Sequence, residues 1–296
     1  MSILVDQNTR VIISGITGRE GQMAARLMTK YQTKVVAGVT PGRGGEQVDG
    51  IPVYDSMQAA RNEHDLDAAL IYVPPSGAAD SIVEAVDAGI TLIVVITERI
   101  PIHEVSEALA VAREKGAIVV GPNSLGIISP GKAKIGTIGG DKEARCFAEG
   151  QVGVISRSGG MTTETSWMVK KAGFGCSTSI SCGGDYLIGA SFAELAQLFE
   201  ADPGTRAIAL FCEPGTSYEA ELADYIEKGL VRKPVIAYVA GGFLANIQSQ
   251  AKFGHAGAIL EKGRSTPEIK QRLAAAGVRV AEEYDDMIPL LQQALA

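Results

Sequence analysis

His255 is the histidine of this 296-residue sequence whose neighbours best suit chemistry. It lies in the segment KFGHAGA, residues 252–258, where small residues on both sides leave the imidazole accessible to another group. A histidine side chain can act as a covalent nucleophile, and a neighbouring acid can orient it. The other two histidines, His64 and His103, lie in charged stretches that are typical of solvated faces. His255 is therefore a candidate nucleophile, with a helix-capping histidine as the alternative interpretation.

Three glycine-rich loops follow apolar runs in the second half of the chain, at residues 156–160, 181–185 and 213–216. In an open parallel sheet, ligands bind beyond the carboxyl ends of the strands. The loop at 158–160 opens a helix, so its backbone amides can receive an anion. Glu213 is the acid at the end of an otherwise apolar run, which makes it a candidate to orient His255.

A further glycine-rich turn, SGITGREG at residues 14–21, follows the first apolar run. Glycines at positions 15, 18 and 21 let the backbone turn tightly into a helix and approach phosphates at its positive end. The spacing is GxxGxxG, whereas dinucleotide-binding domains have GxGxxG. The turn is a candidate phosphate site, and a plain strand-to-helix turn is an equally good interpretation.

The second apolar run ends in VTPGRGG, residues 39–45, and so brings a cation, Arg43, to this edge. An NAD-binding domain usually has an acid here to hold the ribose hydroxyls. A cation suits a ribose with an extra phosphate, as in NADP or in CoA with its 3′-phosphate. A solvated arginine in a loop is the alternative.

The segment GIISPGKA, residues 126–133, resembles a nucleotide-binding P-loop but lacks its final hydroxyl residue, because Ala133 stands there. Pro130 interrupts the segment, and no amphipathic helix follows it. The sequence therefore contains no recognisable ATP site.

The elements that must position these residues alternate along the chain, with short apolar runs followed by helical patterns. This alternation predicts an α/β fold with parallel strands covered by helices on both faces. The stretch 127–150 is rich in glycine and charge and has no clear period, so we expect it to be a linker between two domains, 1–126 and 151–296. Strands are expected at residues 10–15, 33–40, 68–74, 92–97, 117–122, 151–156, 176–181, 206–213 and 233–242.

Composition excludes several other classes of protein. The net charge of -7 disfavours a nucleic-acid partner, which requires a basic face. No apolar run approaches the roughly 20 residues of a membrane span, and no secretory signal is visible at the N-terminus. The four cysteines are scattered, which favours a reduced cytoplasmic protein over a disulfide framework or a metal site.

Taken together, the motifs resemble those of succinyl-CoA synthetase alpha subunits, over essentially the whole chain. They are ITGREG, GVTPGRGG, IYVPP, VVIT followed by Glu98, VGPN, VISRSGG, GGD and FGHAGAI, in that order. SRSGGM and KFGHAGA are also similar to the corresponding part of ATP-citrate lyase. The resemblance implies a CoA-binding Rossmann-like domain followed by a flavodoxin-like ligase domain.

The resemblance also implies a role for individual residues. His255 is the phosphorylated histidine and Glu213 its orienting acid, while Ser158, Gly159 and Gly160 form the helix end that holds the phosphate. Asn123 and Ser124 lie near the acid substrate, and no metal ligands are implied. The residues expected around CoA are Gly15, Thr17, Gly18, Arg19, Glu20, Gly21, Arg43, Tyr72, Val73, Pro74, Thr97 and Glu98.

Members of this family take ATP or GTP with Mg²⁺ on an ATP-grasp beta subunit, in αβ or α2β2 complexes. The implied reaction phosphorylates His255, passes the phosphoryl group to the acid, and lets the CoA thiol displace phosphate from the acyl phosphate. A covalent intermediate divides one difficult step into easier ones.

The departures from the family pattern concern the acid. The chain reads GPNSLG where succinate enzymes usually read GPNCPG, and EPGT where they read EIGG. Arg99 replaces a glycine, and Tyr186 follows the GGD motif where small residues or proline are common. Succinate is the default substrate, with citrate, malate or a sulfonated acid such as sulfoacetate as alternatives. An NADP-binding oxidoreductase and a non-catalytic CoA-binding module are the alternatives from other classes.

Overall fold

A computed structural model describes residues 2–242 and 265–296 of the chain. The first half forms a sheet in the strand order β3-β4-β2-β1-β5-β6-β7. All neighbours in it are parallel except the short β3, which pairs antiparallel with β4. The bounds are β1 (Arg10–Ser14), β2 (Lys34–Val39), β3 (Gln47–Val48), β4 (Ile51–Tyr54), β5 (Ala68–Ile71), β6 (Leu92–Val95) and β7 (Ile118–Val120).

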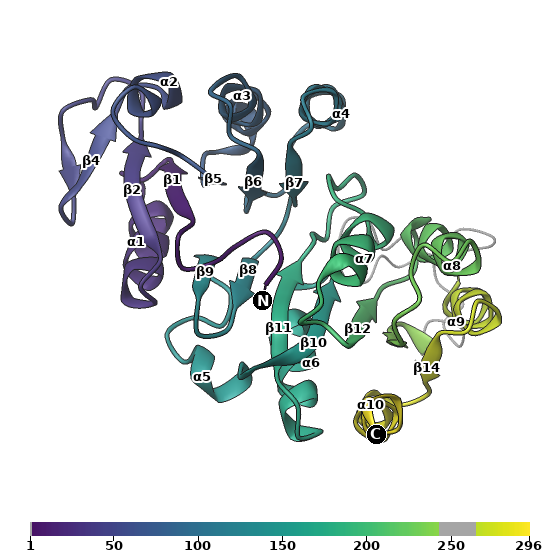
Figure 1. Ribbon diagram of the computed structural model, residues 1–296. Helices are drawn as coiled ribbons and strands as arrows, with labels where there is room; N and C mark the ends of the chain where they lie inside the picture. The colour runs from purple at the N-terminus through teal and green to yellow at the C-terminus, as the bar shows by residue number, and fades with distance from the viewer. Residues whose placement is uncertain (1, 243–264) are drawn as a thin grey trace.

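Helices cover both faces of this first sheet, which is why β5 and β6 are buried along their whole length. Apolar side chains of α2 (Met57–Arg61), α3 (Pro75–Asp87) and α4 (Ile102–Glu114) form a core with one face. Helix α1 (Arg19–Lys30) packs on the opposite face, where Figure 1 shows it below the sheet with α3 and α4 above. The expected α/β class is thus confirmed in this half.

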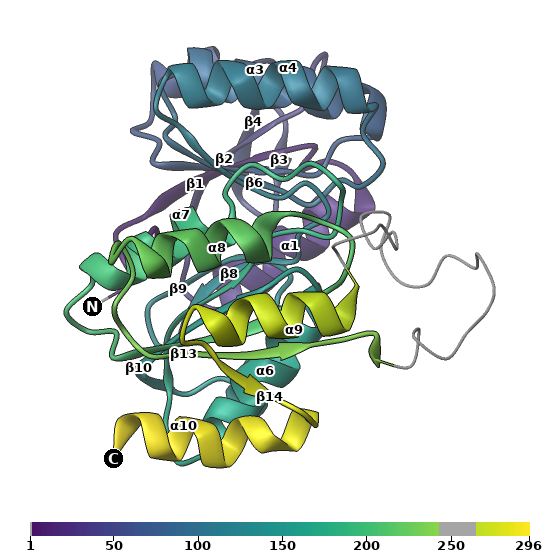
Figure 2. The ribbon, with the colours of Figure 1, turned by 90° about the vertical axis from the view of Figure 1, so that its right-hand side faces the viewer.

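The second half forms a sheet in the order β14-β13-β12-β10-β11-β8-β9. Its strands run parallel except for β8, which is antiparallel to both of its neighbours, β11 and β9. In Figure 2, α7 (Phe192–Ala201), α8 (Tyr218–Glu227) and α9 (Thr266–Ala275) lie on one side of this sheet, and α6 (Gly159–Lys171) and α10 (Met287–Leu295) on the other. A 3-10 turn (Tyr284–Asp286) precedes α10. The strands are β10 (Glu149–Ser156), β11 (Cys176–Ser181), β12 (Ala207–Cys212), β13 (Val235–Val239) and β14 (Arg279–Ala281).

Residues 127–150, expected to be a linker, instead carry regular structure. They hold most of the antiparallel hairpin β8 (Gly126–Ser129) and β9 (Ala133–Gly136), then α5 (Glu143–Cys146) and the start of β10. Both hairpin strands are fully buried, including the side chain of Lys134. The strand pattern could not be recognised in the sequence, because one strand carries a lysine and a Pro-Gly turn separates the two strands. The same hairpin explains the false P-loop, because the segment is strand, turn and strand, with no helix at its end.

The hairpin joins the two sheets. Ile127 and Ile135 share one hydrophobic cluster with Met28 of α1 and with side chains of α7. Thr33 accepts a hydrogen bond from the Lys134 amide (3.0 Å) and donates one to the Lys134 carbonyl (2.8 Å). The two halves are therefore packed against each other through a continuous apolar core.

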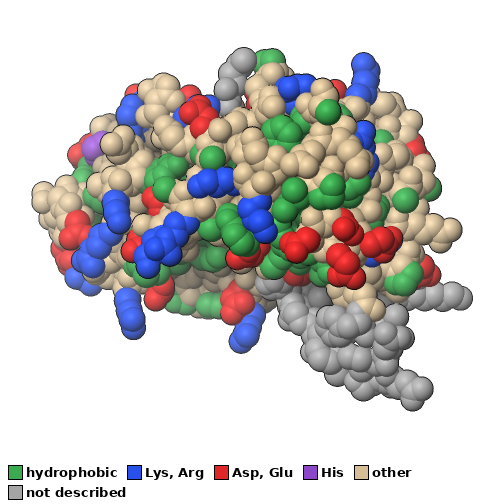
Figure 3. Space-filling model, turned by 90° about the horizontal axis from the view of Figure 1, so that it is seen from below, with side chains coloured by type: hydrophobic (Ala, Val, Ile, Leu, Met, Phe, Trp, Pro, Cys, Tyr) green, Lys and Arg blue, Asp and Glu red, His purple; other side chains and the backbone are tan. Residues whose placement is uncertain are grey.

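Within the ranges 2–242 and 265–296, no helix is long and apolar enough to cross a membrane. On the face seen in Figure 3, Lys and Arg side chains are mixed with Asp and Glu, so the described atoms of this face present no continuous basic surface.

Candidate functional site

The turn between β1 and α1 requires glycine at two places. Gly15 has φ +81°, and a Cβ there would lie 2.7 Å from the Tyr72 carbonyl oxygen. A Cβ on Gly21 would lie 2.3 Å from the Gly15 carbonyl oxygen. Helix α1 starts after Gly18 with no side-chain cap, so its positive end has no capping group of its own and suits an anion. The hydroxyl of Thr17 donates to that of Thr40 at 3.0 Å and ties the turn to the end of β2.

Arg43 lies beyond the end of β2, in a loop closed by its own amide donating to the Thr40 carbonyl. Its half-exposed guanidinium donates to both carboxylate oxygens of Glu46, at 2.8 and 2.6 Å. This hydrogen bonding raises the pKa of Arg43 and lowers the pKa of Glu46. Arg43 is thus a fixed cation at the edge that holds the glycine turn, and a ligand phosphate would compete with Glu46 for it.

Other residues expected around CoA gather at the same edge. The amide of Tyr72 donates to Ser14 at 3.0 Å, and the Thr97 hydroxyl donates to the Val73 carbonyl at 2.6 Å. The Tyr72 hydroxyl reaches across to Thr137 of the second half at 3.3 Å, and burial raises the pKa of this phenol. Pro74 precedes α3, Glu98 follows Thr97, and Arg19 and Glu20 form the first turn of α1. The carboxyl ends of β1, β2, β5 and β6 therefore bring the whole expected set to one edge.

Asn123 and Ser124 follow β7 and lead into the hairpin. The Asn123 amide donates to the Thr97 carbonyl at 3.0 Å, so Asn123 adjoins the expected CoA edge. Ser124 is buried, and its hydroxyl donates to the Ser181 carbonyl at 2.5 Å and accepts from the Gly126 amide at 2.8 Å. The hydroxyl of Ser124 holds two strands together, and contact of Asn123 with a substrate stays a prediction.

Asp185 connects the two candidate sites, and sequence reasoning did not single it out. One of its carboxylate oxygens accepts the Arg99 amide at 3.2 Å, and the other accepts the Asn123 side-chain amide at 3.0 Å. Arg99 and Asn123 both have positive φ, at 59° and 58°, a conformation that side chains other than glycine seldom adopt. The available signal was the GGD motif directly after a buried strand.

The loop before α6 has the geometry of an anion site. Ser158 caps the helix, its hydroxyl accepting from the Met161 amide at 3.5 Å. A Cβ on Gly159 would collide with the side chain of Leu125 at 2.2 Å, so this glycine is required by packing. A Cβ on Gly160 would meet nothing within 4 Å, so packing inside the chain does not require glycine there. The expected phosphate loop is confirmed as a helix N-terminus, and phosphate binding by it stays a prediction.

Arg157 lies beneath this loop with a fully buried side chain, which sequence reasoning also missed. Its guanidinium donates to the carbonyls of Gly184 and Asp185, at 3.2 and 2.9 Å, and to the Thr216 hydroxyl at 3.4 Å. Thr216 in turn donates to the carboxylate of Glu219 at 3.3 Å. One arginine therefore connects all three glycine-rich loops of the second half.

Two carboxylates, Glu213 and Glu219, are buried on either side of Thr216 in the sequence. Glu219 is 1% exposed, and desolvation raises its pKa to about 7 despite the opposing charge of Arg157. Glu213, at the end of β12, is 9% exposed. His255 lies outside the described residues, so its contact with Glu213 stays a prediction. The described residues on either side of that segment meet at this edge, because Thr266 donates to the Ala240 carbonyl at 2.8 Å.

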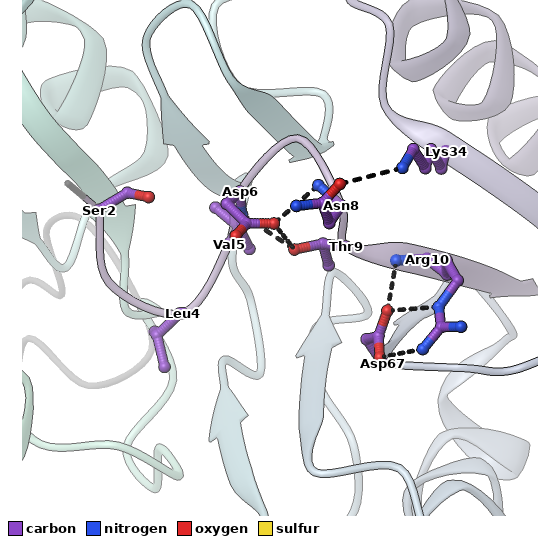
Figure 4. Close-up of a pocket in the computed structure, with 9 residues that line it drawn as sticks. All are labelled: Ser2, Leu4, Val5, Asp6, Asn8, Thr9, Arg10, Lys34 and Asp67. Carbon is purple, nitrogen blue, oxygen red and sulfur yellow. Dashed lines mark hydrogen bonds and ion pairs between the residues drawn. The ribbon is translucent and has the colours of Figure 1, made fainter.

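A pocket of about 590 Å³ lies at the opposite, amino-terminal edge of the first sheet (Figure 4). Arg10 points at Asp67 and donates to its carboxylate from Nε and Nη2, at 2.8 and 2.9 Å. Lys34 donates to Asn8 at 3.3 Å. The cations of this pocket are occupied by groups of the chain itself, and none of the expected site residues lines it.

Comparisons with known proteins match both halves of the chain. Residues 6–99 match the CoA binding domain, and residues 149–294 match the succinyl-CoA ligase like flavodoxin domain. Subunit alpha 2 of the ADP-forming succinate–CoA ligase of Archaeoglobus fulgidus is 43% identical over all of both chains. The ADP-forming sulfoacetate-CoA ligase subunit SauD of Bilophila wadsworthia is 41% identical, again over all of both chains.

A solved structure shows the same fold. ATP citrate lyase from Methanothrix soehngenii, in complex with citrate and coenzyme A, superposes with a TM-score of 0.91 over 99% of this chain at 23% identity. The chain spans about half the length of that lyase, 50%. Fold and matched domains define a CoA ligase subunit, with a CoA-binding domain followed by a flavodoxin-like domain. The chain belongs to the succinate–CoA ligase alpha-subunit family.

Proposed function

We propose that the chain is the alpha subunit of a nucleotide-dependent acid–CoA ligase that works through a phosphohistidine at His255. The observation that carries this proposal is the chain of hydrogen bonds between the two candidate sites. Thr97 at the CoA edge accepts from Asn123, Asn123 donates to Asp185, and the carbonyl of Asp185 accepts from Arg157 beneath the candidate anion loop, residues 158–160. A ligase needs its two sites to be adjacent, because the thiol bound at one site must attack the acyl phosphate formed at the other.

In this mechanism the chain's residues bind and orient the reactants. Glu213 orients His255, and the helix end at Ser158–Gly159–Gly160 holds the phosphoryl group that His255 receives from ATP or GTP. A carboxylate oxygen of the acid attacks phosphorus, the bond from phosphorus to the histidine nitrogen breaks, and an acyl phosphate forms. The CoA sulfur then attacks the acyl carbon and releases phosphate. Preorganised amides stabilise the moving charge without reorganisation.

Partner and compartment follow from the same proposal. The nucleotide and its Mg²⁺ bind an ATP-grasp beta subunit, in an αβ or α2β2 complex, in the cytoplasm. CoA is held by the turn at residues 15–21, with Arg43 near its extra phosphate. This assignment is favoured over an NADP-binding oxidoreductase because residues 6–99 match a CoA binding domain.

The acid is succinate or another small acid. Relatives of similar identity are named as succinate–CoA ligase and as sulfoacetate-CoA ligase subunits. Citrate and malate remain on the panel to be tested, because the loops near Asn123 depart from the pattern of succinate enzymes.

The proposal is tested on the complex with the beta subunit. With Mg²⁺ and ATP or GTP, the intact mass of this chain should rise by one acid-labile phosphate located at His255, and CoA plus the right acid should discharge it. His255→Asn should abolish labelling and turnover, while His103→Asn on the exposed start of α4 serves as the control. Labelling that survives in His255→Asn, or a wild-type chain that takes no phosphate, contradicts the proposal.

A further inference from the structure

Arg99 occupies a backbone position that favours glycine. Its φ of 59° lies in the left-handed region, where a long side chain is seldom found. Backbone strain of this kind persists only where surrounding contacts impose it, and it concentrates at functional sites. The contact here is Asp185, whose carboxylate accepts the Arg99 amide at 3.2 Å.

Asp185 is itself held from several directions. Its second carboxylate oxygen accepts from the Asn123 side chain at 3.0 Å, and its carbonyl accepts from the buried Arg157 at 2.9 Å. The adjoining loop is fixed as well, because the Tyr218 hydroxyl donates to the Tyr186 carbonyl at 3.2 Å and accepts from the Ile188 amide at 3.1 Å. The backbone of Arg99 is therefore anchored to a rigid loop of the second half.

The guanidinium of Arg99 is directed to solvent and lightly paired. Its side chain is 81% exposed, and its ion pair is with the adjacent Glu98, at 3.6 Å and 53% exposed. An exposed pair at this distance contributes little stability. The cation is consequently available to a ligand, in contrast to Arg43, which forms two short hydrogen bonds with Glu46.

Arg99 lies between the two candidate sites. It lies two residues beyond Thr97 of the expected CoA edge, and Asp185 connects it to Arg157 beneath the anion loop. Figure 1 shows the loop after β11 rising toward the end of β7, so this contact is made between the two sheets. In the proposed reaction the acid receives a phosphoryl group at the loop of residues 158–160, and the CoA thiol then attacks it from the expected CoA edge. The acid therefore has to bind between these two places.

We propose that Arg99 is a specificity-determining residue that binds a second anionic group of the acid, either a carboxylate or a sulfonate. The inference rests on the proposed function and deepens it: the substrate class is a small acid with two anionic groups. One group reacts, and the other pairs with the guanidinium, whose planar donors suit both carboxylate and sulfonate oxygens.

The test uses the complex with the beta subunit and compares wild type, Arg99→Gly and Arg99→Lys. Glycine relieves the positive φ and removes the cation, so a loss of function cannot be attributed to backbone strain. Lysine keeps the charge. Each form is assayed with succinate, malate and sulfoacetate, which have two anionic groups, and with acetate and propionate, which have one.

Arg99→Gly should raise KM for the two-anion acids on the order of 10- to 100-fold, as expected for loss of a charge-assisted hydrogen bond. KM for CoA and labelling of His255 by the nucleotide should stay unchanged, and Arg99→Lys should recover part of the loss. Succinate, malate and sulfoacetate are compared by their kcat/KM in wild type. The acid with the highest value shows whether the second anionic group is a carboxylate or a sulfonate.

Three results overturn the inference while the proposed function stands. They are an equal rise of KM for one-anion and two-anion acids, a rise of KM for CoA alone, and a wild type that prefers acetate or propionate. Failure of His255 labelling in wild type is a different result, because it rejects the proposed function and this inference with it.

Discussion

Arg157 and Glu219 place two ionisable groups in the interior beneath the loop at residues 158–160. Within the described part of the chain, the Nε of Arg157 and the Oε1 of Glu219 have no hydrogen-bond partner. Removing such groups from water is costly, and their attraction repays this only with good geometry. The arginine fixes the neighbouring loops in position, because its guanidinium donates to the carbonyls of Gly184 and Asp185 and to the hydroxyl of Thr216.

Glu219 should make stability depend on pH. Its pKa is raised to about 7 in the folded chain, from 4.5, because burial disfavours the carboxylate. Between these two values the folded state binds more protons than the unfolded state, so the unfolding free energy falls as pH rises. Glu219→Gln should remove about 2 to 3 kcal/mol of this fall between pH 5 and 8. Urea unfolding followed by the fluorescence of Trp167, the single tryptophan, measures it.

The control for this experiment is Glu107→Gln, which removes an exposed carboxylate on α4 and should leave the slope as in wild type. An unchanged slope in Glu219→Gln would show that Glu219 does not keep its proton near neutral pH.

At the scale of helices and strands, the sequence predicted the features that depend on the local pattern of apolar residues and glycines. The apolar runs became buried strands, and the glycine-rich loops lie at their carboxyl ends because parallel strands place those ends together. The hairpin β8–β9 was missed because Lys134 is buried on a four-residue strand, against the usual meaning of a charge. Asp185 and Arg157 were missed because their roles depend on contacts with Arg99 and Thr216, far away in the sequence.

The turn between β1 and α1 allows a test at this scale. Gly21→Ala places a Cβ 2.3 Å from the Gly15 carbonyl oxygen, so the turn has to open. We expect a loss of about 1 to 3 kcal/mol of stability and at least about tenfold weaker CoA binding, by thermal unfolding and calorimetry. Gly77→Ala on α3 is the control, since its Cβ would be 3.9 Å from Val73 and alanine favours a helix. CoA affinity that survives Gly21→Ala would place the phosphates elsewhere.

For the whole molecule, the junction between the halves decides whether the two sites act together. Lys134 of β9 donates to the Gly140 carbonyl at 2.8 Å, pairs with Glu143 at 3.6 Å and lies over the Tyr31 ring at 5.3 Å. Burial lowers the pKa of this ammonium. Tyr31 and Thr33 come from the first half and Lys134 from the second, so the halves are linked by polar contacts inside an apolar core. A thiol and an acyl phosphate held on separate halves can meet only if those halves keep a fixed relation.

Thr33→Val tests this linkage with almost no change of shape. The hydroxyl of Thr33 serves both the amide and the carbonyl of Lys134, and valine would leave these two buried groups without partners, at a cost of about 1 to 3 kcal/mol. If the halves form one cooperative unit, hydrogen exchange should speed up to a similar extent in β5 and in β12, while Thr33→Ser, which keeps the hydroxyl, should remain close to wild type. Faster exchange confined to one of these strands would show that the halves unfold separately, and the fixed relation between the thiol and the acyl phosphate would then have to come from the beta subunit.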